Sequence, residues 1–209
     1  MKLYTHWAFS PRKVHFALAE LDLRVDEIFV DLLAGEQRTP AFEAINPMRR
    51  VPVLDDDGYV LWESNAILAY LGERECRYWP GDARARADAL RWMFFEAKDL
   101  ADSVGPLWFF GRAMPRHGLP LSETLPDGTP LETRLTQARS ALTRPLTIAD
   151  DRFGTRTWAL GEQFSMVDCA LGTTLEALAS SGFDLSGYAS VSAYVERIRR
   201  RSAWATLDA

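Results

Sequence analysis

The spacing of apolar residues changes near residue 80 of the chain. Before that point, short runs rich in β-branched and aromatic residues alternate with segments of helical spacing, which predicts strands and helices in mixed order. After it, every periodic segment has the spacing of a helix. The pattern therefore predicts an α/β domain followed by an all-α domain.

The first part of the chain is predicted to form a β-α-β unit. Residues 2–5 form the first strand, and Ser10-Pro11 opens a helix, because serine is a favoured N-cap and proline a favoured first helical residue. Apolar residues at helical spacing give this helix one buried stripe. A second strand is predicted over residues 25–32, followed by a polar loop with a short helix near residues 35–44.

A β-hairpin and a third helix complete the predicted α/β domain. Two short β-type runs, at residues 53–54 and 59–61, flank the turn signal Asp55–Gly58. A helix then starts at Ser64 and continues to about Arg74, with its apolar residues on one face.

Pro52 lies where the first strand of the hairpin begins. Its missing N–H is tolerated at a sheet edge or a strand start, or where a cis peptide bond turns the Val51 backbone outward. Such a backbone can pair with an extended peptide as an added strand. Ser64 and the first N–H groups of its helix can hold a carboxylate, and the neighbouring Glu63 can take an ammonium. These groups together suit a small peptide that carries a free amino acid end.

The motifs at these positions support a family resemblance. Val-Pro-Val-Leu at residues 51–54, followed by Glu-Ser-Asn-Ala-Ile at 63–67, is similar to the glutathione-binding half of a cytosolic glutathione transferase of the serine type found in bacteria. The resemblance implies a thioredoxin-like glutathione-binding domain over residues 1–76 and a linker over 77–82. An all-helical domain over 83–209 would then shape the electrophile pocket. The resemblance also implies a homodimer.

The helical part of the chain has recognisable helix starts. Asp82 is placed to cap a long helix that continues towards Phe110. The stretch from 115 to 130 is rich in proline and too long for a simple turn, so it is predicted to be a functional lid or a disordered loop. A helix over residues 131–150 follows.

Two further helices are predicted near the end of the chain. Ser165 and Asp168 resemble a capping box, with aspartate in place of the usual glutamate or glutamine. We assign this pair to folding and not to catalysis. The last helix carries its apolar stripe over residues 191–198, and the basic run at 197–201 suits its solvated C-terminus.

Composition and charge limit the classes of protein to which this chain can belong. The 209-residue chain has a net charge of -5 and a pI near 5.3, which gives no support for nucleic-acid binding. No apolar run is long enough to span a bilayer and no signal segment is recognisable, so a cytoplasmic protein without membrane attachment is predicted. Cys76 and Cys169 suggest no disulfide framework, and the three histidines have no partner at metal-ligand spacing, so no metal is expected.

The resemblance makes the glutathione thiol the reacting group and glutathione a co-substrate. The thiolate is the nucleophile, and a pKa near ~8.5 must fall by about two units, roughly 2.7 kcal/mol, for the thiol to ionise at neutral pH. Ser10 is the predicted hydroxyl donor to the sulfur, at a helix N-terminus that favours an anion. A purely structural N-cap is the alternative role.

The loop before Ser10 departs from the family pattern. Serine-type members usually carry Ser-Pro-x-x-Arg-Lys-Val, whereas Arg-Lys-Val follows Ser-Pro directly in this chain. The family's serine could therefore match Ala8, and Trp7, Phe9 or a backbone N–H would then line the sulfur. Tyr4, inside the first strand, is a weaker candidate.

Six positions match the family's contacts to glutathione. They are Gln37 and Arg50 for the glycyl carboxylate, Val51 and Pro52 for the backbone pairing, and Glu63 and Ser64 for the γ-glutamyl end. Arg50 replaces a lysine that the family usually has, and arginine can bind a carboxylate in bidentate fashion.

The resemblance predicts conjugation of the glutathione thiolate to a hydrophobic electrophile. Aromatic residues of both domains are expected to line the electrophile pocket, although they could equally be core: Trp7, Phe9, Trp108 and Phe109. The alternatives are a glutathione-binding regulatory or ligand-binding protein with weak or no transferase activity, and a glutathione-dependent isomerase, peroxidase or dehalogenase. Disulfide reduction through a catalytic cysteine is disfavoured, because no cysteine stands near Ser10.

Overall fold

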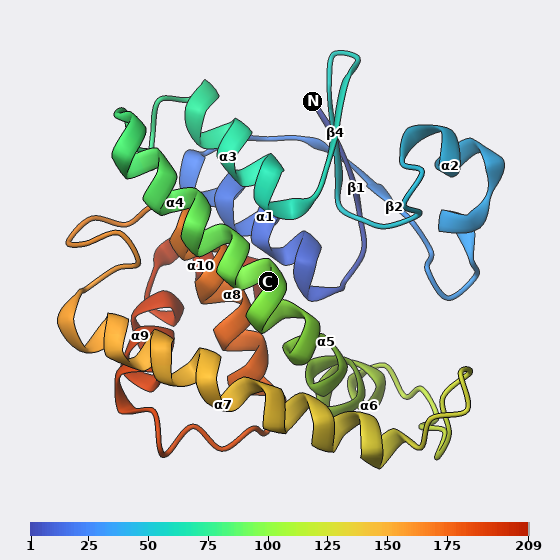
Figure 1. Ribbon diagram of the computed structural model, residues 1–209. Coiled ribbons are helices and arrows are strands. Elements are labelled where there is room, and N and C mark those ends of the chain that lie inside the picture. Colours follow the sequence, from blue (N-terminus) through green and yellow to red (C-terminus); the bar gives the residue numbers. More distant parts are fainter. Residues whose placement is uncertain (209) are drawn as a thin grey trace. The chain divides into compact units, whose positions relative to one another are not determined.

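The computed structural model describes residues 1–208, and its chain forms two compact units (Figure 1). The first unit comprises Met1–Trp79 together with the segment that starts at Ser202, and the second comprises Pro80–Arg201. The chain passes from one unit to the other inside the 77–82 segment. The first unit therefore includes a C-terminal segment that the prediction of an 83–209 helical domain assigned to the second.

The first unit is built on a four-stranded mixed sheet with the strand order β2-β1-β3-β4. Its strands are β1 (Lys2–Thr5), β2 (Asp26–Phe29), β3 (Val53–Asp56) and β4 (Tyr59–Trp62). β1 pairs with β2 in parallel, and the other two pairings are antiparallel. This thioredoxin-like sheet, with a helical second unit after it, confirms the predicted fold class.

Helices cover both faces of this sheet. Since side chains alternate across a strand, the paired Leu3 and Leu54 face one side, while the paired Tyr4 and Val53 face the other. α1 (Phe9–Leu21) and α3 (Ser64–Arg74) lie on one face and α2 (Pro40–Ile45) on the opposite face (Figure 1). Phe42 of α2 packs in a buried cluster with Val53, against which Tyr4 also packs.

The second strand is shorter than the predicted segment 25–32. It ends at Phe29, and the chain turns because the Asp31 carboxylate accepts hydrogen bonds from the N–H groups of Leu33 and Ala34 at 2.9 and 3.0 Å. A 3₁₀ turn, Glu36–Arg38, then leads into α2, so the short helix predicted near residues 35–44 is present as two pieces.

The C-terminal segment contributes to the core of the first unit. It forms α10 (Ser202–Ala205) and the 3₁₀ turn Thr206–Asp208. Trp204 is 4% exposed, and its ring meets that of Phe16 edge-on at 5.0 Å between centroids.

The second unit is helical throughout. Its helices are α4 (Ala83–Phe95), α5 (Asp102–Trp108), α6 (Met114–Arg116), α7 (Leu131–Thr155), α8 (Met166–Ser180) and α9 (Ala189–Arg199). Asp82 caps α4 as predicted, since its carboxylate accepts the N–H groups of Arg84 and Ala85 at 3.0 Å. Two π-helical segments, Glu96–Ala101 and Phe109–Ala113, link α4, α5 and α6 into the long run predicted from Asp82. No helix in the described part of the chain is long and apolar enough to cross a membrane.

α8 is the central helix of the second unit, and a buried carboxylate fixes its start. Ser165 and Asp168 form the predicted capping box. Asp168 is fully buried and accepts four hydrogen bonds, from Ala159 N–H, Ser165 N–H and Ser165 Oγ at 2.8 Å and from Tyr194 Oη at 2.9 Å. Burial raises the pKa of Asp168, and the four donors act against that rise.

Candidate functional site

The Val51 backbone enters β3 through a cis Val51–Pro52 peptide bond. Asn46, which is 1% exposed, holds the chain just before this bond. Its Nδ2 donates to the Arg50 carbonyl at 2.7 Å, and its Oδ1 accepts from Met48 N–H at 2.9 Å. Asn46 was not among the predicted site residues, although an Asn-Pro pair is a recognised turn signal. This side chain positions the segment whose main chain is expected to pair with a peptide.

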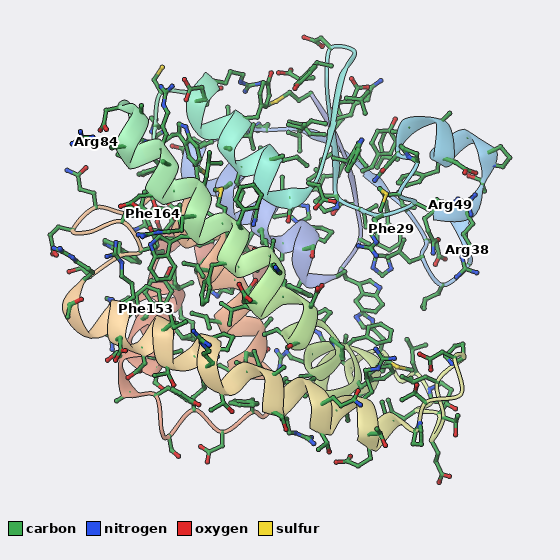
Figure 2. The ribbon with its side chains drawn as sticks, viewed as in Figure 1. Phe29, Arg38, Arg49, Arg84, Phe153 and Phe164 are labelled. Carbon is green, nitrogen blue, oxygen red and sulfur yellow. The ribbon has the colours of Figure 1, made fainter. Side chains whose placement is uncertain are left out.

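Arg49 and Arg50 have different surroundings. Arg49 has a positive φ of 53° and its Nη2 lies 2.6 Å from Glu43 Oε1. Figure 2 shows Arg49 and Arg38 beside α2. Arg50 is exposed, and no carboxylate among residues 1–208 forms an ion pair with it. Its guanidinium is therefore available to an incoming carboxylate, which agrees with the choice of Arg50 over Arg49.

Gln37 lies in the 3₁₀ turn ahead of α2 and is loosely held. Its Nε2 donates to the Leu32 carbonyl at 3.4 Å, at the long end of the range for a hydrogen bond. Its buried Oε1 has no partner in the described part of the chain. The amide thus has hydrogen-bonding capacity left for a ligand.

α3 begins at Ser64, as predicted, and the residue before it is strained. Glu63 has φ 73° and ψ 113°, in a region that a residue with a side chain rarely occupies. No side chain caps α3 and no acidic residue lies in its first turn. The first N–H groups of the helix and its positive dipole end are thus left without an anion, as in a carboxylate-binding helix terminus.

The prediction that Ser10 caps the first helix is wrong. α1 begins at Phe9, and Ala8 is the N-cap, because Ala8 has the extended backbone of a cap (φ −65°, ψ 157°). Ser10 is the second helical residue and Pro11 the third. Ser10 remains in the first turn, where N–H groups lack partners within the helix. The sequence contained a signal for this difference. Because Arg-Lys-Val follows Ser-Pro directly, the family's serine aligns with Ala8.

The four aromatic residues predicted to line an electrophile pocket are divided between the units. Trp7 and Phe9 are half-buried in the loop and first turn after β1, and the Trp7 ring lies 4.3 Å from that of His6. Trp108 ends α5 and Phe109 starts the second π-helical segment, both half-buried.

The second unit has an open surface pocket of its own of about 350 Å³. Its lining residues come from the α5 region, from the 115–130 loop and from α7: Pro106, Phe110, Leu125, Pro126, Asp127 and Arg134. Trp108 and Phe109 are not among them. The loop is ordered at this point, since Leu125 N–H donates to the Thr129 carbonyl at 2.9 Å and Asp127 pairs with Arg134 at 2.7 Å. Residues 125–129 thus form a tight turn fastened to α7, and the role of the 115–130 stretch as a lid stays a prediction.

The two cysteines have different surroundings. Both are free thiols, with Cys76 exposed after α3 and Cys169 buried in α8. In the described residues, no group of three or more His, Cys, Asp or Glu side chains could hold a metal ion.

The fold defines a class of protein in which a helical domain follows a thioredoxin-like domain. Comparison with known proteins identifies the family. Residues 1–73 match the family model of the glutathione S-transferase N-terminal domain, and residues 132–197 match that of the C-terminal domain. The chain belongs to the glutathione S-transferase family.

Individual relatives cover most of the chain. The disulfide-bond oxidoreductase YfcG of Escherichia coli is 32% identical over 88% of this chain and 82% of its own length. Glutathione S-transferase F14 of Arabidopsis thaliana is 28% identical over 98% and 81%. A glutathione S-transferase structure from Pseudomonas fluorescens superposes with a TM-score of 0.82 at 28% identity, covering 97% of this chain and 96% of the other.

Proposed function

We propose that this protein conjugates the thiolate of glutathione to a hydrophobic electrophile. The observation that carries the proposal is the uncapped start of α3, where strained Glu63 precedes Ser64. Ser64 and the first N–H groups of α3 hold the γ-glutamyl carboxylate, and Glu63 takes the ammonium. The main chain at Val51-Pro52 pairs with the cysteinyl part of the tripeptide.

The glycyl carboxylate is assigned to Gln37 and Arg50. Arg50 has no ion-pair partner in the described residues, and the Gln37 amide has an unused oxygen and a weakly bonded nitrogen. An arginine can hold a carboxylate through two parallel hydrogen bonds. These two side chains and Ser64 would thus bind the two charged ends of one extended tripeptide.

Thiol activation is assigned to the first turn of α1, with Ser10 as the hydroxyl donor. A hydrogen bond to a charged acceptor contributes roughly 1.5–3 kcal/mol, and a helix N-terminus about 0.3–1 kcal/mol. Together they match the roughly 2.7 kcal/mol needed to lower a thiol pKa by two units. The backbone N–H groups near Ala8 are the alternative donors.

The electrophile is assigned to the aromatic residues Trp7 and Phe9 of the first unit and Trp108 and Phe109 of the second. We also propose a homodimer and, as a division of the sequence, the limits 1–76, 77–82 and 83–209 that the family implies, with the segment from Ser202 packing in the first unit. Leu90 and Phe94, one turn apart on α4, are 42% and 71% exposed, which supports an apolar contact surface on this helix.

Calorimetry and thiolate absorbance test the function on the whole chain. Glutathione should bind, and its ultraviolet thiolate band should appear at neutral pH only in the presence of the protein. A panel of aryl halides, epoxides, peroxides and mixed disulfides then identifies the reaction. The assays with mixed disulfides test a second candidate function, which the name of the E. coli relative suggests. In this reaction the thiolate of glutathione itself attacks a disulfide. Absence of any heat with millimolar glutathione would exclude both.

Ser10→Ala tests the assignment of the hydroxyl donor. Loss of a hydrogen bond worth roughly 1.5–3 kcal/mol should raise the pKa of the bound thiol by about 1–2 units and slow turnover at neutral pH by about 10- to 100-fold. Ser10→Thr, which keeps a hydroxyl, is the matched control and should lie near the wild type. A Ser10→Ala enzyme with unchanged turnover and thiol pKa would transfer the role to the backbone.

A further inference from the structure

The first turn of α1 is closed more weakly than the first turns of the next three helices. Its first backbone hydrogen bond, from Arg12 N–H to the Ala8 carbonyl, measures 3.4 Å, whereas the equivalent bonds of α2, α3 and α4 measure 2.9, 3.0 and 3.0 Å. No side chain caps α1 at Ala8, while Thr39 and Asp82 cap α2 and α4 through their side chains. Because a helix end without capping bonds frays, contacts from outside the helix must help to fix this turn.

The segment that starts at Ser202 packs against α1 within the first unit. Both α10 and the 3₁₀ turn Thr206–Asp208 contact this helix. Thr206 Oγ1 donates to the Ala203 carbonyl at 2.7 Å, which ties the turn to α10, and Trp204 is 4% exposed. The Trp204 ring therefore occupies a defined position on the surface of α1.

Trp204 meets two residues of α1 that lie one turn apart. Its ring meets that of Phe16 edge-on at 5.0 Å between centroids, and the Arg12 guanidinium carbon lies over it, 4.7 Å from its centroid. Residues four apart lie on the same face of a helix. Arg12 is half-buried, and a cation over an aromatic face is attracted more strongly when it is partly removed from water. The tryptophan thus joins the first turn of α1 to the buried part of the helix.

The groups assigned to the glutathione backbone and the group assigned to its thiol lie on different elements. The backbone and both charged ends of the tripeptide are assigned to residues within 37–64, whereas the thiol is assigned to the first turn of α1, where Ser10 is the second helical residue. A hydrogen bond weakens steeply when its length or angle departs from the optimum. Displacement of that turn would therefore weaken the bond to the sulfur and leave the other contacts in place.

We propose that Trp204 is a positioning residue for thiol activation. Through its contact with Arg12 it holds the first turn of α1 in the place where Ser10 and the first N–H groups stabilise the thiolate of bound glutathione. The inference rests on the proposed function, because that function places the sulfur at this turn. The C-terminal segment would thus complete the active site of the first unit as well as its core.

Trp204→Leu and Trp204→Phe test the proposal in the full-length protein. Both remove volume from the same buried position, but only phenylalanine keeps an aromatic face for Arg12. Thiolate absorbance measured against pH gives the ionisation constant of the bound glutathione thiol. Trp204→Leu should lower this constant by about 3- to 10-fold, the order of a partly buried cation–π interaction, and Trp204→Phe should stay within about twofold of the wild type. Neither substitution changes a charge, so a shift reports the geometry of the first turn.

Two controls separate this role from a general loss of packing. S-methylglutathione has no ionisable thiol, so both Trp204 variants should bind it with wild-type affinity. Phe153→Ala removes a buried ring from α7 of the second unit, and it should lower the midpoint of urea unfolding without changing the ionisation constant. Equal ionisation constants for the two Trp204 variants, or weaker binding of S-methylglutathione by Trp204→Leu, would overturn the role of Trp204. Absence of S-methylglutathione binding in the wild type would overturn the proposed glutathione site, and this inference with it.

A measurement on the wild type keeps the proposal testable if Trp204→Leu does not fold. The amide proton of Arg12 closes the first turn of α1 through a long hydrogen bond. If Trp204 fixes this turn, hydrogen exchange at Arg12 should be slower than in an unstructured peptide by at least about tenfold, and within about tenfold of the rate at Phe16. Exchange at Arg12 as fast as in an unstructured peptide would show that the turn frays despite Trp204, and would overturn the proposal.

Discussion

Asp168→Ala should lower the free energy of unfolding of this protein by about 3–5 kcal/mol, the range for substitutions that leave buried polar groups without their partner. The carboxylate is fully buried and accepts four hydrogen bonds. Its removal leaves the N–H groups of Ala159 and Ser165 and the hydroxyls of Ser165 and Tyr194 without an acceptor. Each buried unsatisfied donor costs about 1–3 kcal/mol. Relaxation of the surrounding structure keeps the total loss below the sum of the four separate costs.

The location of these donors explains why one substitution acts on a large part of the second unit. Ala159 lies in the loop before α8, Ser165 is the N-cap of α8, and Tyr194 belongs to α9. The Tyr194 ring also stacks on Phe153 of α7 at 3.6 Å between centroids, and Figure 2 marks Phe153 on that helix. Asp168 thus links the loop before α8 and, through Tyr194, helices α9 and α7 to the start of α8.

Urea unfolding followed by circular dichroism measures the effect. The matched control is Asp184→Ala, because Asp184 also accepts a backbone N–H, that of Ser186, but is exposed. It should leave the urea midpoint almost unchanged. Asp168→Asn, which keeps one acceptor oxygen, should lie between the wild type and Asp168→Ala. Equal midpoints for the two alanine variants would show that the buried network contributes little.

Ser64→Ala should weaken glutathione binding by about 10- to 150-fold, which corresponds to the loss of one hydrogen bond to a charged carboxylate at roughly 1.5–3 kcal/mol. Ser64 begins α3 directly after strained Glu63, at a helix end with no capping side chain. Under the proposed function, its hydroxyl donates to the γ-glutamyl carboxylate. Calorimetric titration with glutathione gives the dissociation constant of each variant.

The dipeptide cysteinylglycine makes this test specific. It lacks the γ-glutamyl group, so Ser64→Ala and the wild type should bind it equally. Ser186→Ala, at an exposed serine of the second unit, controls for the substitution itself and should not change either affinity. Equal loss of affinity for glutathione and cysteinylglycine would show that Ser64 does not read the γ-glutamyl end.

Local chemistry was sufficient to predict much of the fold. Asp82 and Ser165 identify helix starts because a side-chain oxygen beside the first turn satisfies free N–H groups, whatever the rest of the molecule does. The hairpin over β3 and β4 and the start of α3 at Ser64 are signalled in the same way by turn residues. The motif at residues 51–67 led to the family for the same reason, since it lies in one short stretch.

Features that depend on distant parts of the chain could not be predicted in this way. Serine is a better cap than alanine by local preference, yet Ala8 caps α1, because the chain leaves β1 in a short loop and is already helical at Phe9. The burial of Lys13 and the bonds of Asn46 to neighbouring main chain have no signal in apolar spacing. The binding roles of the predicted site residues remain predictions for the titrations above.

The return of the C-terminal segment to the first unit has a consequence for how the protein is made. Trp204, whose ring packs on Phe16, is synthesised only after the whole of the second unit. Domains generally fold in the order of their synthesis, but here residues 1–79 emerge without the aromatic ring that completes their core. The N-terminal part of a nascent chain should therefore stay incompletely packed, and open to chaperones, until the segment from Ser202 has been synthesised.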